Sequence, residues 1–179
     1  MKLINKTESG RSMIEMLGVL AIIGVLSVGG LAGYNMAMGR VRVNRVIDEL
    51  QLVAVNIRTA VPNGTYDNIS TIATNMKILD TLKENLASLG ASASAAVKEQ
   101  KSKGGTVYDR FAINFTKLPL DACRRIAGLD WGTESYVQST AAKDEEANSS
   151  TIATGTSSAI SECKVDEDGA ISAFALLLK

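Results

Sequence analysis

The first third of the chain carries a long apolar segment with polar residues on both sides. No charged side chain occurs between Met16 and Tyr34. As an α-helix this segment would be about 29 Å long, close to the hydrocarbon thickness of a bilayer. The pattern therefore predicts a polar start, one helix of membrane-spanning length and a remainder of mixed polarity.

The helical pattern continues past the apolar segment. Apolar residues recur there at steps of three and four, the spacing of one helix face: Val43, Val46, Ile47, Leu50, Val53, Ala54 and Ile57. Pro62-Asn63-Gly64 then ends the pattern. We predict one helix from about Ser12 to Ala60, whose second half needs a globular head to cover its apolar face.

The following residues mix helical and strand patterns. Isoleucine, leucine and methionine at helical spacing predict a helix at about 68–89, and the alanine- and lysine-rich residues 91–105 predict a loop or a frayed helix end. Alternating apolar residues around Ile113 predict a half-buried strand. Pro119 is expected to open a short helix that carries Cys123.

The C-terminal part predicts short elements. Residues 134–140 read as a strand, and the acidic, serine-rich residues 143–158 read as an exposed loop. A last pair of strands is expected to start at Cys163, turn at 166–169 and return through 170–178.

Composition narrows the possible functions. The chain has no histidine, which removes the commonest general base and a common metal ligand. No catalytic motif stands out, so we expect a protein that is not an enzyme and needs no cofactor. Lysine plus arginine equals aspartate plus glutamate, 19 each, which argues against nucleic-acid binding.

The start of the apolar segment has a distinctive arrangement. Gly10 closes the polar start, and Glu15 lies five residues later in the string GRSMIEMLGVLAIIGVLSVGG. This string resembles the class III signal of type IV pilins and of the pseudopilins of type II secretion systems. The resemblance implies that a prepilin peptidase cleaves between Gly10 and Arg11 and methylates the new N-terminus at Arg11. Lys2 and Lys6 would keep the leader in the cytoplasm.

The resemblance also gives Glu15 a role. A carboxylate entering hydrocarbon costs roughly 3 kcal/mol, so it favours a partner of opposite charge. In this family the glutamate meets the N-terminal amine of a neighbouring subunit, which sets the register of a homopolymer. The simpler alternative is a glutamate at the membrane edge. Arg11 departs from the apolar first residue usual in the family, and it either strengthens this pairing or slows processing.

Gly29 and Gly33 form a GxxxG spacing within the apolar segment. Such spacing lets helices approach closely, whereas glycine also weakens a helix by up to ~1 kcal/mol relative to alanine. Two interpretations follow: a close-packing face, or a segment that melts locally when subunits assemble.

The chain is thus expected to comprise four regions. These are a leader (1–10), a transmembrane and polymerisation helix (11–38), its amphipathic continuation (39–61) and a pilin head (62–179). The order strand, LPLDAC, helix, second cysteine and final apolar strand looks like the type IVb pilins of the PilS kind. Heads of this family are α+β, with an antiparallel sheet packed on the long helix.

Two chemistries depend on where the head resides. In an oxidising compartment Cys123 and Cys163 should form a disulfide, which would stabilise the head by roughly 4 kcal/mol; the alternative is a redox-active pair. Asp166 and Asp168 are weak candidates for calcium ligands, since the segment DEDG also fits a simple turn.

Three functions remain open at this point. The first is the major subunit of a filament for adhesion, aggregation, motility or DNA exchange, assembled by a platform protein in the bacterial inner membrane. The second is a minor pilin or pseudopilin. The third is a periplasmic enzyme or binding domain with a membrane anchor. In the first, the chain spans the inner membrane before assembly and is extracellular afterwards.

Overall fold

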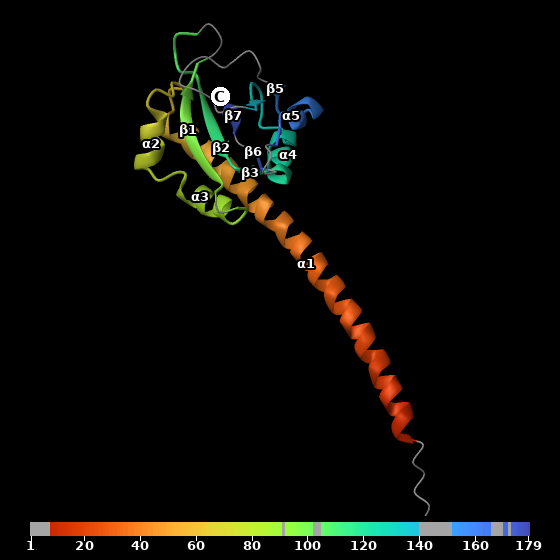
Figure 1. Ribbon diagram of the computed structural model, residues 1–179. Coiled ribbons are helices and arrows are strands. Elements are labelled where there is room, and N and C mark those ends of the chain that lie inside the picture. Colours follow the sequence, from red (N-terminus) through yellow and green to blue (C-terminus); the bar gives the residue numbers. More distant parts are fainter. Residues whose placement is uncertain (1–7, 91, 102–104, 140–151, 166–169, 172) are drawn as a thin grey trace, which may run out of the picture. The chain divides into compact units, whose positions relative to one another are not determined.

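The computed structural model describes residues 8–90, 92–101, 105–139, 152–165, 170–171 and 173–179 (Figure 1). The chain forms two compact units, Met1–Val41 and Arg42–Lys179. Helix α1 (Glu8–Ala60) contributes to both. It begins four residues before the predicted start at Ser12 and ends, as predicted, just before Pro62-Asn63-Gly64.

The second part of α1 supplies one wall of the core of the Arg42–Lys179 unit. Val46, Leu50, Val53 and Ile57 are fully buried, at the three- and four-residue steps that the sequence predicts. Hydrogen bonds flank this wall, and in one of them Arg125 donates to Asn44 Oδ1 over 2.8 Å. The helix therefore needs the rest of the unit to cover its apolar face.

A five-stranded antiparallel sheet packs against this part of α1 (Figure 1). In spatial order its strands are β1 (Ser94–Gln100), β2 (Arg110–Thr116), β7 (Phe174–Leu178), β4 (Tyr136–Gln138) and β5 (Ile152–Ala153). The α+β class predicted from the sequence is confirmed. The strands predicted around Ile113 and at 134–140 are also present, the second shortened to β4.

The two faces of the sheet differ. Phe111, Ile113 and Phe115 of β2 point into the core shared with α1, as their alternation predicts. On the opposite face Ala112, Ala175 and Leu177 form a small second cluster with Tyr136 packed against it. Small residues dominate that second face, so the main core lies between the sheet and the helix.

The single helix expected at 68–89 is wrong. Two short helices, α2 (Ile69–Asn75) and α3 (Asp80–Ala87), replace it. They are separated at Lys77, whose φ of 54° is left-handed and incompatible with a continuing helix. The apolar spacing carries across this break because Ile78 and Leu79 still reach the core.

The loop or frayed helix end expected at 91–105 is also wrong for its central residues. Residues 94–100 form β1, an edge strand that pairs with β2 from Ser94↔Thr116 to Gln100↔Arg110. Ala95 and Val97 are buried, and exposed residues alternate with them in the first half of the strand. The strand exists because β2 offers it a complete set of partners.

The short helix expected after Pro119 is confirmed as α4 (Leu120–Gly128). Just before it, β3 (Leu118–Pro119) pairs with β6 (Ala170–Ile171) in a separate two-stranded sheet. The strand expected over 170–178 is therefore divided between two sheets, β6 in one and β7 in the other.

The region from 143 to 165 differs from the expectation in two places. Within the predicted loop, residues 152–153 form β5 and helix α5 (Ser157–Ser161) begins. Cys163 follows α5 in a segment without regular structure and starts no strand. The predicted turn at 166–169 lies outside the described residues.

Candidate functional site

The first candidate site is the apolar part of α1 in the Met1–Val41 unit. Among the described residues, one helix is long and apolar enough to cross a membrane, with a mean hydropathy of 2.2 in its most apolar window. None of that window is buried within the chain. Its exposed side chains lie on every side of the helix: Met13, Ile14, Met16, Leu17, Val19, Leu20, Ile22, Ile23, Val25, Leu26, Val28, Leu31, Tyr34 and Met36.

A helix that is apolar all round is a buried helix, in a membrane or in a larger assembly. The glycines of this segment likewise lack close neighbours within the subunit. A Cβ added at Gly29 or at Gly33 meets nothing within 4 Å. Packing within the subunit therefore does not require glycine at these positions. The backbone is helical throughout residues 26–34 in the single subunit.

The processing residues lie at the start of this helix. Gly10 and Arg11 have helical backbone, inside the first turns of α1. Glu15 lies about one turn further on, with its side chain exposed among apolar neighbours. The predicted cleavage, the methylation and the pairing of Glu15 remain predictions, because they involve a peptidase and a second subunit.

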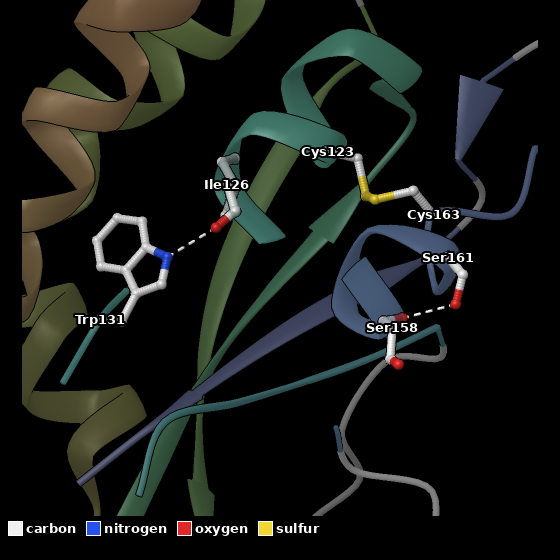
Figure 2. The surroundings of a disulfide bond; sticks show 6 residues. All are labelled: Cys123, Ile126, Trp131, Ser158, Ser161 and Cys163. Atoms are coloured by element: carbon white, nitrogen blue, oxygen red, sulfur yellow. Dashed lines mark hydrogen bonds between the residues drawn. A yellow bond between two sulfur atoms is a disulfide. The ribbon is translucent and has the colours of Figure 1, made fainter. Parts of the chain in front are cut away.

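The second candidate site is the disulfide-bonded part of the head. Cys123 on α4 and Cys163 after α5 form a disulfide across 40 positions of sequence, with their Cα atoms 5.9 Å apart (Figure 2). Both cysteines are buried. The redox-active alternative would need at least one accessible sulfur, so the geometry supports a structural disulfide.

Trp131 supports the same region. Its indole Nε1 donates to the carbonyl oxygen of Ile126 over 2.7 Å, at the end of α4 (Figure 2). The ring packs against the main core and is only partly buried. The hydrogen bond fixes the segment that leads from α4 to β4. Trp131 thus contacts both the end of α4 and the main core.

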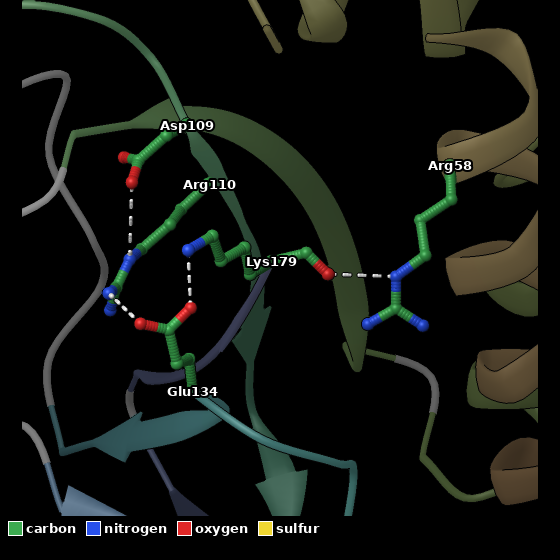
Figure 3. Close-up of polar contacts among 5 residues, drawn as sticks. All are labelled: Arg58, Asp109, Arg110, Glu134 and Lys179. Carbon is green, nitrogen blue, oxygen red and sulfur yellow. Dashed lines mark hydrogen bonds and ion pairs between the residues drawn. The ribbon is translucent and has the colours of Figure 1, made fainter. Parts of the chain in front are cut away.

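A third cluster joins the end of β7 to β4 and α1 (Figure 3). Arg58 Nε donates to the carbonyl oxygen of Lys179 over 2.9 Å, while the ammonium group of Lys179 pairs with Glu134. Arg110 lies 3.7 Å from Glu134 and stacks over the ring of Tyr136. The hydrogen bond from Lys179 is the main cause that lowers the pKa of Glu134. These residues hold the end of β7 in place.

The weak calcium candidates Asp166 and Asp168 lie outside the described residues. Within the described ranges, no three aspartate, glutamate or cysteine side chains gather closely enough to hold a metal ion. The described part of the chain therefore offers no metal centre on which a chemical mechanism could be built.

Sequence patterns missed one feature of α1. Leu52 and Val55 are 51% and 55% exposed, on the side of the helix that turns away from the core. Their spacing of three residues was visible in the sequence. The prediction followed the longer apolar stripe through Leu50, Val53 and Ile57, which the head buries, and did not consider Leu52 and Val55.

A comparison with models of known protein families finds no match, and a comparison with curated proteins finds no relative. The structure by itself has a pilin-like architecture. A long N-terminal apolar helix packs on an antiparallel sheet, and a disulfide closes the C-terminal region.

Proposed function

We propose that this protein is a structural subunit that polymerises through its apolar N-terminal helix into a filament of the type IV pilus kind. The observation that carries the proposal is the exposed apolar surface of α1 between Met13 and Met36. Burying one large aliphatic side chain is worth about 1.5–3 kcal/mol, so covering this surface is worth on the order of 20 kcal/mol or more. Lipid covers it before assembly, and neighbouring helices cover it afterwards.

Glu15 gives the assembly a direction. In hydrocarbon its carboxylate costs roughly 3 kcal/mol, a cost that a positive group on a neighbouring copy offsets. Cleavage after Gly10 creates such a group, the α-amino group of Arg11. Prepilin peptidase and an inner-membrane assembly platform are the partners that this route requires.

The head supports an exported location. Disulfides form and persist outside the reducing cytosol, and Cys123 and Cys163 are joined in the core of the head. A disulfide that frames the C-terminal region is typical of pilins, whereas pseudopilin heads commonly lack it. We therefore favour a pilus subunit for adhesion, aggregation, motility or DNA exchange over a pseudopilin.

The test compares Glu15→Gln with Glu8→Gln, since cleavage would remove the second carboxylate with the leader. Glu15→Gln is expected to insert into the membrane at normal levels and to yield at least tenfold less filament, because about 1.4 kcal/mol lost per contact already lowers affinity tenfold. Glu8→Gln should assemble normally. Filament is measured in material sheared from the cell surface.

The N-terminus of the mature protein provides a second readout. Mass spectrometry should find a methylated Arg11, and Gly10→Val should leave the leader attached and abolish assembly. Native protein that starts at Met1 and forms no polymer would contradict the proposal. Loss of secretion on deletion, without sheared filaments, would instead indicate a pseudopilin.

A further inference from the structure

The outer side of α1 in the Arg42–Lys179 unit carries a second regular pattern. Five exposed residues follow each other at steps of three and four and so line one side of the helix. This outer seam consists of Arg45, Asp48, Leu52, Val55 and Thr59. It lies opposite the buried wall, because the buried residues Val46, Leu50 and Val53 fall on the other side of the same turns.

The seam has an apolar end and a charged end. Leu52 and Val55 leave about half of their surface in solvent, and the hydroxyl of Thr59 donates to the carbonyl oxygen of Val55 over 2.9 Å. Steps of three and four residues are the spacing with which one helix packs along another. The apolar end therefore has the form of a helix contact.

The charged end consists of one basic and one acidic residue. Other arginines near the seam have partners within the unit: Arg42 donates to the carbonyl oxygen of Ser88 and Arg58 to that of Lys179. For Arg45 and Asp48, by contrast, no hydrogen bond or ion pair is found with any residue that the structure describes. Both side chains are exposed and available to a neighbour.

The two charges complement a displaced copy of the same helix. In an unstaggered parallel pair, Arg45 would face Arg45 and Asp48 would face Asp48, which is repulsive. Displacement by three residues, about 4.5 Å along the axis, brings Arg45 level with Asp48 of the neighbour. Displacement by four residues brings it level with Glu49.

The pair proposed at the N-terminus requires a displacement in the same direction. The amine of Arg11 precedes Glu15 by four positions, and Arg45 precedes Asp48 and Glu49 by three and four positions. In both places the basic group comes first along the chain. Both pairs therefore need the neighbour displaced in the same direction along the helix, by four positions for Glu15 and by three for Asp48.

We infer that the outer seam binds a second copy of this chain, with Arg45 of one subunit paired to Asp48 of its neighbour and with Leu52 and Val55 packed beside the pair. This inference rests on the proposed function, since it needs parallel copies held in a filament. It adds a contact on the head-bearing part of α1 that favours the same direction of displacement as Glu15.

The test uses two charge reversals, Arg45→Glu and Asp48→Arg, expressed alone and together. Alone, each chain carries like charges at both positions, so like charges face each other between copies. Filament yield should fall about tenfold or more. Expressed together, the two chains alternate with opposite charges facing, and the yield should return close to that of the wild type. Mass spectrometry should find both chains in the same filaments.

Co-expression separates this contact from a pair within one helix. Neither chain can form an internal pair between positions 45 and 48, so rescue requires contact between subunits. Lys83→Glu, an exposed charge reversal on α3, is the matched control and should assemble normally. Should the reversals prevent accumulation of the subunit, Arg45→Gln against Lys83→Gln gives the same comparison, with a reduced yield expected for Arg45→Gln alone.

Two results would overturn the inference while leaving the filament intact. One is a wild-type yield from either reversal or from Arg45→Gln. The other is a failure of co-expression to rescue while the wild type and the Lys83 control assemble. If the wild type itself forms no filaments, the proposed function fails, and this contact fails with it.

Discussion

The carboxylate of Glu99 on β1 accepts two hydrogen bonds from Ser70, one from its backbone amide over 3.0 Å and one from its hydroxyl over 2.7 Å. Ser70 lies in the first turn of α2, where backbone amides lack partners in their own helix. Glu99 therefore anchors α2 to the edge strand of the sheet. Burial alone would raise the pKa of Glu99, but the hydrogen bonds from Ser70, a backbone hydrogen bond at Glu99 itself and the charge of Lys98 together outweigh it, so the pKa is lowered from its usual value.

We predict that Glu99→Gln lowers the free energy of unfolding of the detergent-solubilised chain by about 1 kcal/mol near neutral pH. Because the pKa is lowered on folding, this stabilisation is complete above the unfolded pKa and is lost as the pH falls through the folded value. The difference between wild type and variant should therefore shrink below about pH 4.5. Thermal melting across pH measures it, and Glu84→Gln on the exposed side of α3 is the control. A constant difference down to low pH would contradict the role of the charge.

Removal of the disulfide should weaken the head strongly. Cys123→Ser together with Cys163→Ser opens a loop of 40 residues. We expect a loss of about 4 kcal/mol, because the unfolded chain regains the entropy that the bridge removes. Chemical unfolding of the full-length chain measures the loss, and reducing agent should bring the wild type to the same stability. A double variant as stable as the oxidised wild type would show that the bridge adds nothing.

Two leucines on α1, two positions apart, should differ strongly in their contribution to stability. Leu50 is fully buried, whereas Leu52 leaves 51% of its surface exposed. Leu50→Ala is expected to cost about 3 kcal/mol in unfolding free energy, since it removes core contacts and leaves a cavity. Leu52→Ala should change subunit stability by less than about 0.5 kcal/mol. Equal losses for the two would contradict the assignment of inner and outer sides of the helix.

The break between α2 and α3 should tolerate glycine. Lys77 adopts a left-handed φ of 54°, which glycine adopts without strain. Lys77→Gly is expected to raise the unfolding free energy by about 0.5 kcal/mol, the relief of strain less the added entropy of the unfolded chain. Lys77→Ala keeps the strained backbone and serves as the control. A gain from alanine equal to that from glycine would exclude backbone strain as the cause.

Elements stabilised by their own sequence were predictable. A segment of about ten residues is enough to predict each of three features: the buried wall of α1, the alternation in β2 and the start of α4 at a proline. Glu15 was equally visible, because a lone carboxylate in an apolar segment is conspicuous in any sequence.

Elements that depend on distant partners were not predictable. Four of the seven residues of strand β1 are alanine, lysine or glutamate, which have weak strand propensity, and the strand forms because β2 lies beside it. The break at Lys77 leaves the apolar spacing almost unchanged. The division of residues 170–178 follows from two partners, since Ile171 pairs with Leu118 whereas Phe174 pairs with Phe115.

The outer seam shows the same limit for a binding surface. Leu52 and Val55 became recognisable once the structure showed which side of α1 the head covers.

The strand order has a consequence for how the subunit is made. Strand β7 lies between β2 and β4, although it is synthesised after both. Until residues 174–178 arrive, those two strands have no common neighbour, and each exposes unpaired backbone groups. The sheet is therefore completed only after translation of these residues. A subunit that stops short of Phe174 carries open strand edges, which proteases and chaperones can distinguish from a finished head.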